Sequence, residues 1–447
     1  MIFNNQQKRI DNIRNAEGAN KEYLIRRRCF DYLPGQAIYN LGEYPVKVNS
    51  KPTDYDKNLV KDLAESGVKL IQLHEDWNDA CRLYGADKFN AVDEDGIKEF
   101  IALCHSYDIK VIAYMSTCYF PEPDQDFREE FHKRDSRLAM NYFNYRHCNH
   151  GSASWREYVM NRSIEAMDKY GFDGIFNDVW HDRVVYDYEK GECVQLDPAD
   201  SVEYDPDFED MICQIYSEVK KRGGIYKLHM SGKNNAPAKD KVYDYMWVGE
   251  GLTDVEPGIG KDFSGYTVPC LDRHFYDGVD AKTYFAYTIP FMQFPLLKTG
   301  RPMIGEGVGL PNVTYYGGDE EEFFWDVKKY AEENPDSPPI YSLWDSIPND
   351  STEYDAWKYY MKYYAPMTKE NSLAYVEIRK SDEILSEIPQ RVYASMFVND
   401  ETYFAVSNLT GEKYTLKLKG MWKNRETGEI SDSFDIENES LLLLVKM

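Results

Sequence analysis

The sequence is short of positive charge and lacks the long apolar segments that membranes require. Its 52 Lys and Arg residues are outnumbered by 77 Asp and Glu residues, which leaves a formal net charge of -25. This charge repels phosphate backbones and anionic lipid heads, so we expect neither nucleic acid nor a membrane surface as a partner. The opening MIFNNQQKRIDNIRN lacks the basic start and apolar core of a secretory signal, and no run of about 20 apolar residues follows. We therefore expect a cytoplasmic protein.

Signatures of bound nucleotides, metals and serine nucleophiles are also missing. The sequence has no G-x-G-x-x-G loop, no phosphate loop ending in Gly-Lys-Ser/Thr and no nucleophilic serine elbow. Its eight cysteines form no C-x-x-C pair, which argues against a zinc knuckle. His147, Cys148 and His150 have ligand-like spacing, but they lie in a polar loop. We predict no cofactor and no metal.

Helical patterns alternate with short apolar runs through the first 250 residues. DYDKNLVKDLAESG precedes VKLIQLHEDW, and DEDGIKEFIALCHSYD precedes IKVIAYMSTCYF. The alternation continues through FDGIFNDVW, IYKLHMSG and YDYMWVGEG, and PGQAIYNLGEYP comes before the first helix. We expect AYTIPFMQFPLL and PIYSLWDS to be the seventh and eighth strands. Strands that alternate with helices form a parallel sheet, so the pattern predicts a (β/α)8 TIM barrel over residues 31–368.

The pattern changes near residue 370 to strand-like runs separated by turn residues. RVYASMFV, TYFAVSNL, YTLKLKG, SFDI and LLLLVKM are separated by ND, TG and similar pairs. This predicts a small C-terminal antiparallel β-sandwich over residues 369–447. Residues 1–30 are polar, and we expect an N-terminal arm or lead-in helix to which we assign no role.

Two carboxylates, Asp178 and Glu250, each end an apolar, aromatic-rich run. In a barrel such residues converge at the C-terminal ends of the strands, where barrel enzymes have their active sites. Retaining cleavage of a sugar bond needs an ionised carboxylate and a protonated one, about 5 to 5.5 Å apart. We expect Asp178 to be the nucleophile, kept charged by polar neighbours such as Asn177 or His181, and Glu250 to be the acid/base, with its pKa raised by Trp247.

Each assignment has a structural alternative. Asp178 could be a helix cap or a buried structural acid, and Glu250, between two glycines, a surface loop acid. Asp182, Asp254 and Asp244 are the nearest substitutes if either assignment fails. Further side chains at the strand ends could stack on a sugar ring or bind its hydroxyls, with core packing or solvated charge as the alternative. These candidate substrate-binding residues are His74, Glu75, Asp76, Trp77, Trp180, His181, Asp182, Lys227, His229 and Trp247.

The order of these strand ends resembles the barrel of retaining alpha-galactosidase-like glycoside hydrolases, family 36 and its relatives, over about residues 35–255. That family has Asp-Asp-Gly-Trp where this chain has His74 to Trp77, and Lys-x-Asp where it has Phe176 and Asp178. Glu250 corresponds to the family's acid/base, and the C-terminal β domain also matches. The departures at His74 and Phe176 remove groups that the family uses to hold galactose hydroxyls.

The resemblance implies a retaining, exo-acting glycoside hydrolase that cleaves an α-linked sugar. Two other functions remain open from the residues. A metal-dependent barrel hydrolase would gather His74, Asp178, His229 and Glu250 around a divalent ion. A non-catalytic carbohydrate-binding barrel would bind sugar without turnover. We expect a carbohydrate as the ligand. The sequence does not decide whether the protein forms a homo-oligomer.

Overall fold

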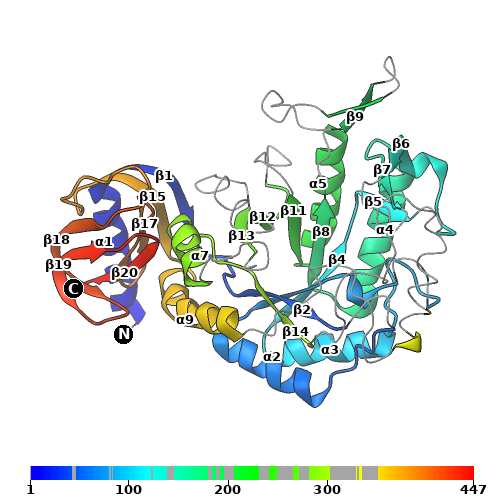
Figure 1. Ribbon diagram of the computed structural model, residues 1–447, viewed down its shortest axis with the longest axis horizontal. Coiled ribbons are helices and arrows are strands. Elements are labelled where there is room, and N and C mark those ends of the chain that lie inside the picture. Colours follow the sequence, from blue (N-terminus) through cyan, green and yellow to red (C-terminus); the bar gives the residue numbers. More distant parts are fainter. Residues whose placement is uncertain are drawn as a thin grey trace. The chain divides into compact units, whose positions relative to one another are not determined.

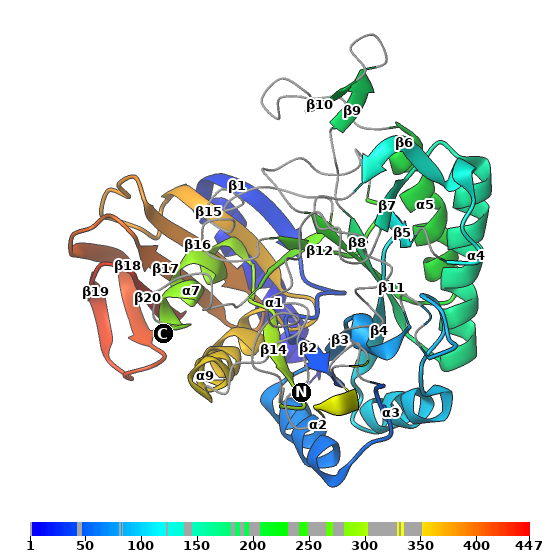
Figure 2. The same ribbon diagram turned by 45° about the vertical axis from the view of Figure 1, so that its right-hand side comes forward.

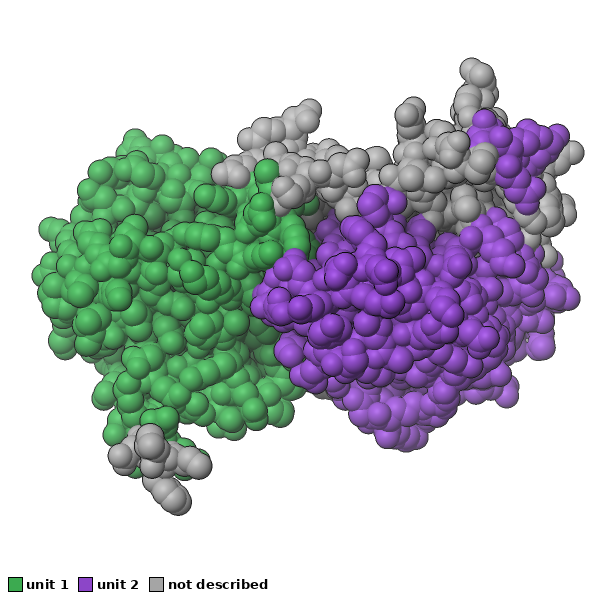
Figure 3. Space-filling view, turned by 90° about the horizontal axis from the view of Figure 1, so that it is seen from below, with its two compact units in different colours: residues 1–35, 248–297, 350–447 green, residues 36–247, 298–349 purple. Residues whose placement is uncertain are grey.

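The computed structural model describes most of the chain and divides it into two compact units. The described residues are 2–42, 47–79, 82, 84–121, 124–137, 145–179, 184–187, 192–195, 206–230, 241–248, 265–270, 281–302, 329, 332–334 and 351–447. One unit comprises residues 36–247 and 298–349, and the other comprises residues 1–35, 248–297 and 350–447 (Figure 3).

An eight-stranded parallel sheet follows the chain order that the sequence predicts. Its strands are β2 (Gln36–Asn40), β3 (Leu70–Leu73), β4 (Lys110–Met115), β8 (Gly174–Val179), β11 (Ile225–Met230), β12 (Tyr245–Val248), β13 (Tyr266–Pro269) and β14 (Leu297–Gly300). Each strand neighbours the next as far as β13, and β14 neighbours β2. Cys270 and Leu296, beside β13 and β14, form a parallel bridge. The predicted (β/α)8 barrel is confirmed.

Helices α2 (Asp54–Ser66), α3 (Glu94–Ser106), α4 (Ala153–Tyr170) and α5 (Pro206–Lys221) alternate with these strands (Figure 1). The beginnings of α2, α3 and α4 are fixed by caps, because Thr53, Asp93 and Ser152 each accept a hydrogen bond from the first turn. The buried face of α3 includes Ile97 and Phe100, as its apolar spacing predicts. The helix and strand pattern of the sequence therefore holds through the sixth strand.

The seventh strand differs from the sequence-based prediction. AYTIPFMQFPLL mostly forms the end of α7 (Ala281–Thr288) and the short helix η4 (Ile289–Phe291), and only its last residue enters β14. Almost every side chain of α7 is buried, so its apolar run shows no helical period and cannot be told from a strand. The true seventh strand is β13, in a Gly- and Pro-rich stretch. PIYSLWDS lies outside the described residues.

A small three-stranded antiparallel sheet is inserted between β4 and α4 (Figure 2). It comprises β5 (Tyr119–Pro121), β6 (His132–Arg137) and β7 (Tyr145–Cys148), with β7 in the middle and the short helix η2 (Glu129–Phe131) before β6. Phe120 and Phe131 pack against Trp155 and Tyr158 of α4 with ring centroids 5.2 to 5.5 Å apart, and against each other at 6.0 Å. The insertion thereby gains an aromatic core. A second small hairpin pairs β9 (Val184–Asp187) with β10 (Glu192–Gln195).

The other unit contains a seven-stranded antiparallel sheet, with order β1-β15-β16-β17-β20-β18-β19. These strands are β1 (Asn20–Arg28), β15 (Leu373–Ser381), β16 (Val392–Val398), β17 (Thr402–Asn408), β18 (Tyr414–Asn424), β19 (Ile430–Ile436) and β20 (Ser440–Lys446). One core, which includes Tyr375, Phe404 and Trp422, collects side chains from β15 to β20. The predicted C-terminal antiparallel β domain is confirmed.

Residues before the barrel belong to this same sheet. Helix α1 (Ile2–Ala19) contributes Ala16 to the core, and β1 pairs antiparallel with β15, with Ile25 opposite Val376. The sequence analysis assigned no role to this segment. Helix α9 (Ser351–Met367) also belongs to this unit and precedes β15. Within the described parts of the chain, no helix is both long and apolar enough to cross a membrane.

Candidate active site

The carboxyl ends of β3, β4, β8, β11 and β12 bring together the side chains of His74, Tyr114, Asp178, His229 and Trp247. Side chains alternate between the two faces of a strand, so Asp178 and Phe176 share one face of β8, whereas Asn177 faces the other way. Asp178 stands opposite His229 in the parallel register of β8 and β11. In the register of β4 and β8, Tyr114 stands opposite Phe176, which comes two residues before Asp178 on the same strand.

Both oxygens of Asp178 accept hydrogen bonds. The Tyr114 hydroxyl donates to Oδ2 at 2.7 Å, and Nδ1 of His229 lies 2.6 Å from Oδ1. Burial in itself disfavours the charged carboxylate, but the charge and hydrogen bond of His229 and the hydrogen bond of Tyr114 outweigh it. The pKa of Asp178 therefore lies below its ordinary value. At neutral pH this arrangement provides an ionised carboxylate at the strand ends.

Four aromatic rings surround Phe176 beneath this carboxylate. The ring centroids of Trp247, Tyr114, His74 and His229 lie 5.3, 5.8, 5.9 and 6.4 Å from that of Phe176. Trp247 also packs against His229 with centroids 4.5 Å apart. Phe176 and these four rings form the floor of the site. This floor is apolar and closely packed, at the position where the alpha-galactosidase-like family has its lysine.

His74 is buried at the end of β3 and its Nε2 lies 3.1 Å from Nε2 of Gln72. Burial lowers its pKa to about 3, although the charge of Asp178 acts in the opposite direction. Near pH 7 His74 is therefore a neutral imidazole. It adds hydrogen-bonding capacity to the site without adding charge.

Asn177 does not have the role that the sequence analysis gave it. The side chain is fully buried, and its Oδ1 accepts hydrogen bonds from the backbone and hydroxyl of Thr117. Its Nδ2 donates to the Tyr226 hydroxyl at 2.7 Å. Asn177 thus joins β8 to its neighbours on the outer side of the barrel. Tyr114 and His229 are the described groups that stabilise the charge of Asp178.

Trp77 and Asp76 follow His74, yet their contacts are structural. Trp77 is fully buried and its Nε1 donates to the backbone oxygen of Tyr114 at 3.2 Å. Its ring packs against Tyr170 and Phe172, so it occupies a core position. Asp76 is buried and accepts a hydrogen bond from the backbone nitrogen of Leu41, which fixes the end of β2.

Lys227 lies on the same face of β11 as His229, two residues earlier and so further from the carboxyl end of the strand. It is fully buried, and its Nζ donates to Oε1 of Gln36 at 3.1 Å. The ammonium also lies 5.9 Å from the ring centroid of Phe176. The ammonium is covered by the barrel interior. It therefore adds a positive charge beneath the floor of the site and is not exposed at the surface of the site.

The remaining candidates cannot be placed. Glu250, Trp180, His181, Asp182 and Asp254 lie outside the described residues, as does the side chain of Glu75. Their roles stay predictions. Asp244, a substitute for either carboxylate, precedes β12 at the other end of the strand from Trp247. There it accepts hydrogen bonds from Lys220 and from the backbone nitrogen of Tyr226.

Among the residues that the structure describes, no group of three or more His, Cys, Asp or Glu side chains is arranged to hold a metal ion. His150 instead lies 3.5 Å from the sulfur of Cys118 and packs against Phe208.

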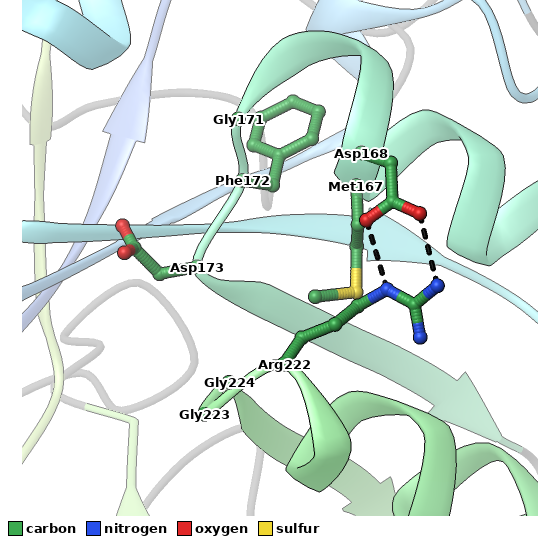
Figure 4. Close-up of a pocket in the computed structure, with 8 residues that line it drawn as sticks. All are labelled: Met167, Asp168, Gly171, Phe172, Asp173, Arg222, Gly223 and Gly224. Carbon is green, nitrogen blue, oxygen red and sulfur yellow. Dashed lines mark hydrogen bonds and ion pairs between the residues drawn. The ribbon is translucent and has the colours of Figure 1, made fainter.

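A hollow of about 270 Å³ lies at the opposite, amino-terminal ends of the strands (Figure 4). It is lined by the turns that lead into β8 and β11. Arg222 forms two hydrogen bonds with Asp168 across its rim, and Asp173 accepts hydrogen bonds from the backbone of Val111 and from His105. These charged groups are engaged in local contacts, and barrel chemistry resides at the other end of the strands.

Tyr114 was missed by the sequence analysis. The run KVIAYM shows no polar alternation, because parallel strands are buried on both faces. A signal was nevertheless present, since the alternation along β4 places Tyr114 and Ile112 on one face and Met115 and Ala113 on the other.

Comparison with known proteins shows which fold this chain has. No known family profile matches the chain, and no curated protein matches its sequence. The alpha-glucosyl transfer enzyme XgtA has a TM-score of 0.59 at 10% identity, covering 96% of this chain and 100% of that chain. The maltogenic alpha-amylase AmyB from Thermotoga neapolitana has a TM-score of 0.56 at 13% identity, covering 92% and 99%. The alpha-amylase from Geobacillus thermoleovorans, complexed with acarbose, has a TM-score of 0.54 at 12% identity, covering 94% and 99%.

At these low identities the likeness concerns the fold alone. The chain has the fold of these proteins, a (β/α)8 barrel with an antiparallel β domain. Their names differ from the alpha-galactosidase-like family that the sequence resembles. The barrel implied by that resemblance is thus confirmed, whereas the more specific family assignment gains no support from these structures.

Proposed function

We propose that this protein is a retaining glycoside hydrolase that cleaves an α-linked, exo-terminal sugar. The observation that carries the proposal is Asp178, an ionised carboxylate at the carboxyl end of the fourth barrel strand, oriented by Tyr114 and His229 above an aromatic floor. Retaining hydrolases need such a charged nucleophile, and flat rings favour the apolar face of a pyranose.

The reaction would proceed in two displacements. An oxygen of Asp178 attacks the anomeric carbon while the bond to the leaving oxygen breaks, and Glu250, the proposed acid/base, protonates that oxygen. Water then attacks the glycosyl ester as Glu250 takes its proton, which releases the sugar and restores both carboxyl groups. The low pKa of Asp178 suits the first step, because only the ionised carboxylate attacks.

We propose α-glucosides as the first substrates to test. The fold is similar to enzymes named as alpha-amylases and as an alpha-glucosyl transfer enzyme. Phe176, in place of the lysine of the alpha-galactosidase-like family, is fully buried and presents no charge to a galactose hydroxyl. These observations favour glucosides over galactosides.

Activity on a panel of aryl α- and β-glycosides tests the proposal. We expect the native protein to cleave an aryl α-glucoside with retention, and Asp178→Asn to lose at least about a thousandfold in kcat/KM, since the covalent route is closed. Asp210→Asn, on the exposed side of α5, is the matched control and should retain full activity. Equal rates for Asp178→Asn and the native chain would remove Asp178 from the mechanism.

Glu250→Gln tests the second carboxylate separately. The variant should lose about 10² to 10⁴-fold on substrates with a poor leaving group and much less on dinitrophenyl glycosides, which leave without protonation. Sugar binding without turnover by the native chain, unaltered in Asp178→Asn, would indicate the non-catalytic barrel instead.

A further inference from the structure

His229 combines a buried position with a direct bond to the proposed nucleophile. Its side chain is 7% exposed, whereas that of Asp178 is 27% exposed, and Nδ1 and Oδ1 lie 2.6 Å apart. A ligand entering the site therefore meets the carboxylate before the imidazole. His229 acts on a bound sugar through Asp178, and this inference rests on the proposed function.

We propose that His229 is a positioning residue that holds Asp178 in one orientation and keeps it ionised for attack. Because an ionised carboxylate can only accept hydrogen bonds, Nδ1 of His229 carries the shared hydrogen. The parallel register places the two residues opposite each other on neighbouring strands, so the contact is built into the sheet. Trp247 packs on the imidazole at 4.5 Å and fixes its plane.

The charges around Asp178 distinguish His229 from its other neighbours. From β4, Tyr114 offers a neutral hydroxyl at 2.7 Å. From the end of β3, His74 is neutral near pH 7 because burial lowers its pKa. Lys227 and Lys298 lie deeper and act on His74 at longer range. Among the described groups, His229 is therefore the one that both hydrogen bonds to the carboxylate and lowers its pKa most strongly through its charge.

The sign of the pH effect follows from the lowered pKa of Asp178. A carboxylate with a depressed pKa stays charged to lower pH. In the native protein kcat/KM should therefore fall only at low pH, and we call this acidic side of the pH profile the acid limb. An opposite charge within about 4 to 6 Å lowers a carboxylate pKa by roughly 1 to 3 units. Removing His229 should therefore move the acid limb upward by about that amount.

Two substitutions separate the hydrogen bond from the charge. His229→Asn keeps a donor near the position of Nδ1, and His229→Leu removes both donor and charge. We expect the acid limb to move upward in both variants and furthest in His229→Leu, with kcat reduced far more than KM is raised. Tyr114→Phe, which removes one neutral donor, is the matched control and should move the limb less. An unmoved acid limb in His229→Leu would overturn the proposal.

Thermal unfolding of the full chain provides a test that needs no substrate. In the native protein, ionised Asp178 stabilises the fold above its unfolded pKa, and this stabilisation is lost as the pH falls through the folded pKa. In His229→Leu the partly buried carboxylate loses the charge and hydrogen bond of His229 and keeps only the hydrogen bond of Tyr114. We therefore expect Asp178→Asn to lower the unfolding temperature of the native chain at pH 7 but to raise that of His229→Leu.

The unfolding measurements and the activity measurements test the role of His229 and the proposed function separately. Equal effects of Asp178→Asn in both backgrounds would show that His229 does not hold the charge, whatever the activity. No cleavage of any glycoside, together with the expected reversal in unfolding temperature, would reject the proposed function while retaining the link between His229 and Asp178. If His229→Leu does not fold, the same comparison is made in His229→Asn.

Discussion

Trp77 is held entirely inside the protein, although it follows polar residues at the end of a strand. Its indole nitrogen donates to the backbone of Tyr114, and its ring packs between Tyr170 and Phe172. A fully buried ring has no face left for a sugar, so its contribution is to the stability of the barrel.

Replacing Trp77 by Phe should therefore act on folding rather than on substrate affinity. We expect the free energy of unfolding to fall by about 1 to 3 kcal/mol, because the change leaves a cavity and removes a buried hydrogen bond. Chemical denaturation measures this loss, and KM should stay unchanged. Trp247→Phe, at the site floor, is the contrasting variant and should alter kcat or KM. A change in KM for Trp77→Phe would place its ring in the site.

The residues of the site could be predicted from the sequence only in part. Asp178 was visible because an acid ends an apolar run, and that signal is local. Its partnership with His229 and Tyr114 depends on the register of three strands whose residues lie about 50 to 64 positions apart, which no local pattern records. Trp77 was a candidate for stacking because it lies next to a predicted strand end, with core packing as the alternative, and the structure shows the core position.

At the scale of the elements, strand β14 depends on a glycine at its end. Gly300 has a φ of +123°, and a Cβ added there would overlap the backbone of Asn40 on β2. The next residue, Arg301, is bonded to the buried carboxylate of Asp56 and to the backbone of Leu41, so the strand end cannot move away easily. The close approach of β14 to β2 therefore requires glycine at this position.

Gly300→Ala should destabilise the barrel more than the same change at an open site. Gly171, the C-cap of α4, has a φ of +83° and nothing within 4 Å of an added Cβ. Gly171→Ala should cost about 1 to 2 kcal/mol for the left-handed conformation alone. We expect Gly300→Ala to exceed this cost clearly, because strain and overlap add. Equal unfolding midpoints for the two variants would show that β14 adjusts without penalty.

The elements that the sequence revealed are those with a clear period and a cap. Helices α2, α3 and α4 have both, and the strands that follow them were found with them. The seventh strand was misplaced because α7 is buried on nearly all sides and carries no period. The insertion of β5, β6 and β7 was missed because its strands are short, and β6 is a polar HKRDSR run.

At the scale of the whole molecule, the first and last segments of the chain build one sheet. In β1, Ile25 is buried and opposite Val376, whereas Leu24 is 50% exposed. Ile25→Asp should therefore lower the free energy of unfolding by about 3 kcal/mol or more, since it buries a charge without a partner. Leu24→Asp, one residue away, is the control and should stay within about 0.5 kcal/mol. Similar losses for both would mean that β1 contributes no buried face.

The pairing of β1 with β15 sets an order of events during synthesis on the ribosome. Asn20 to Arg28 emerge early, yet their partners Leu373 to Ser381 are made more than 340 residues later, after the whole barrel sequence. At about 5 to 20 residues per second the early strand waits tens of seconds with an open edge. During that interval its arginines, Arg26, Arg27 and Arg28, discourage pairing with another nascent chain.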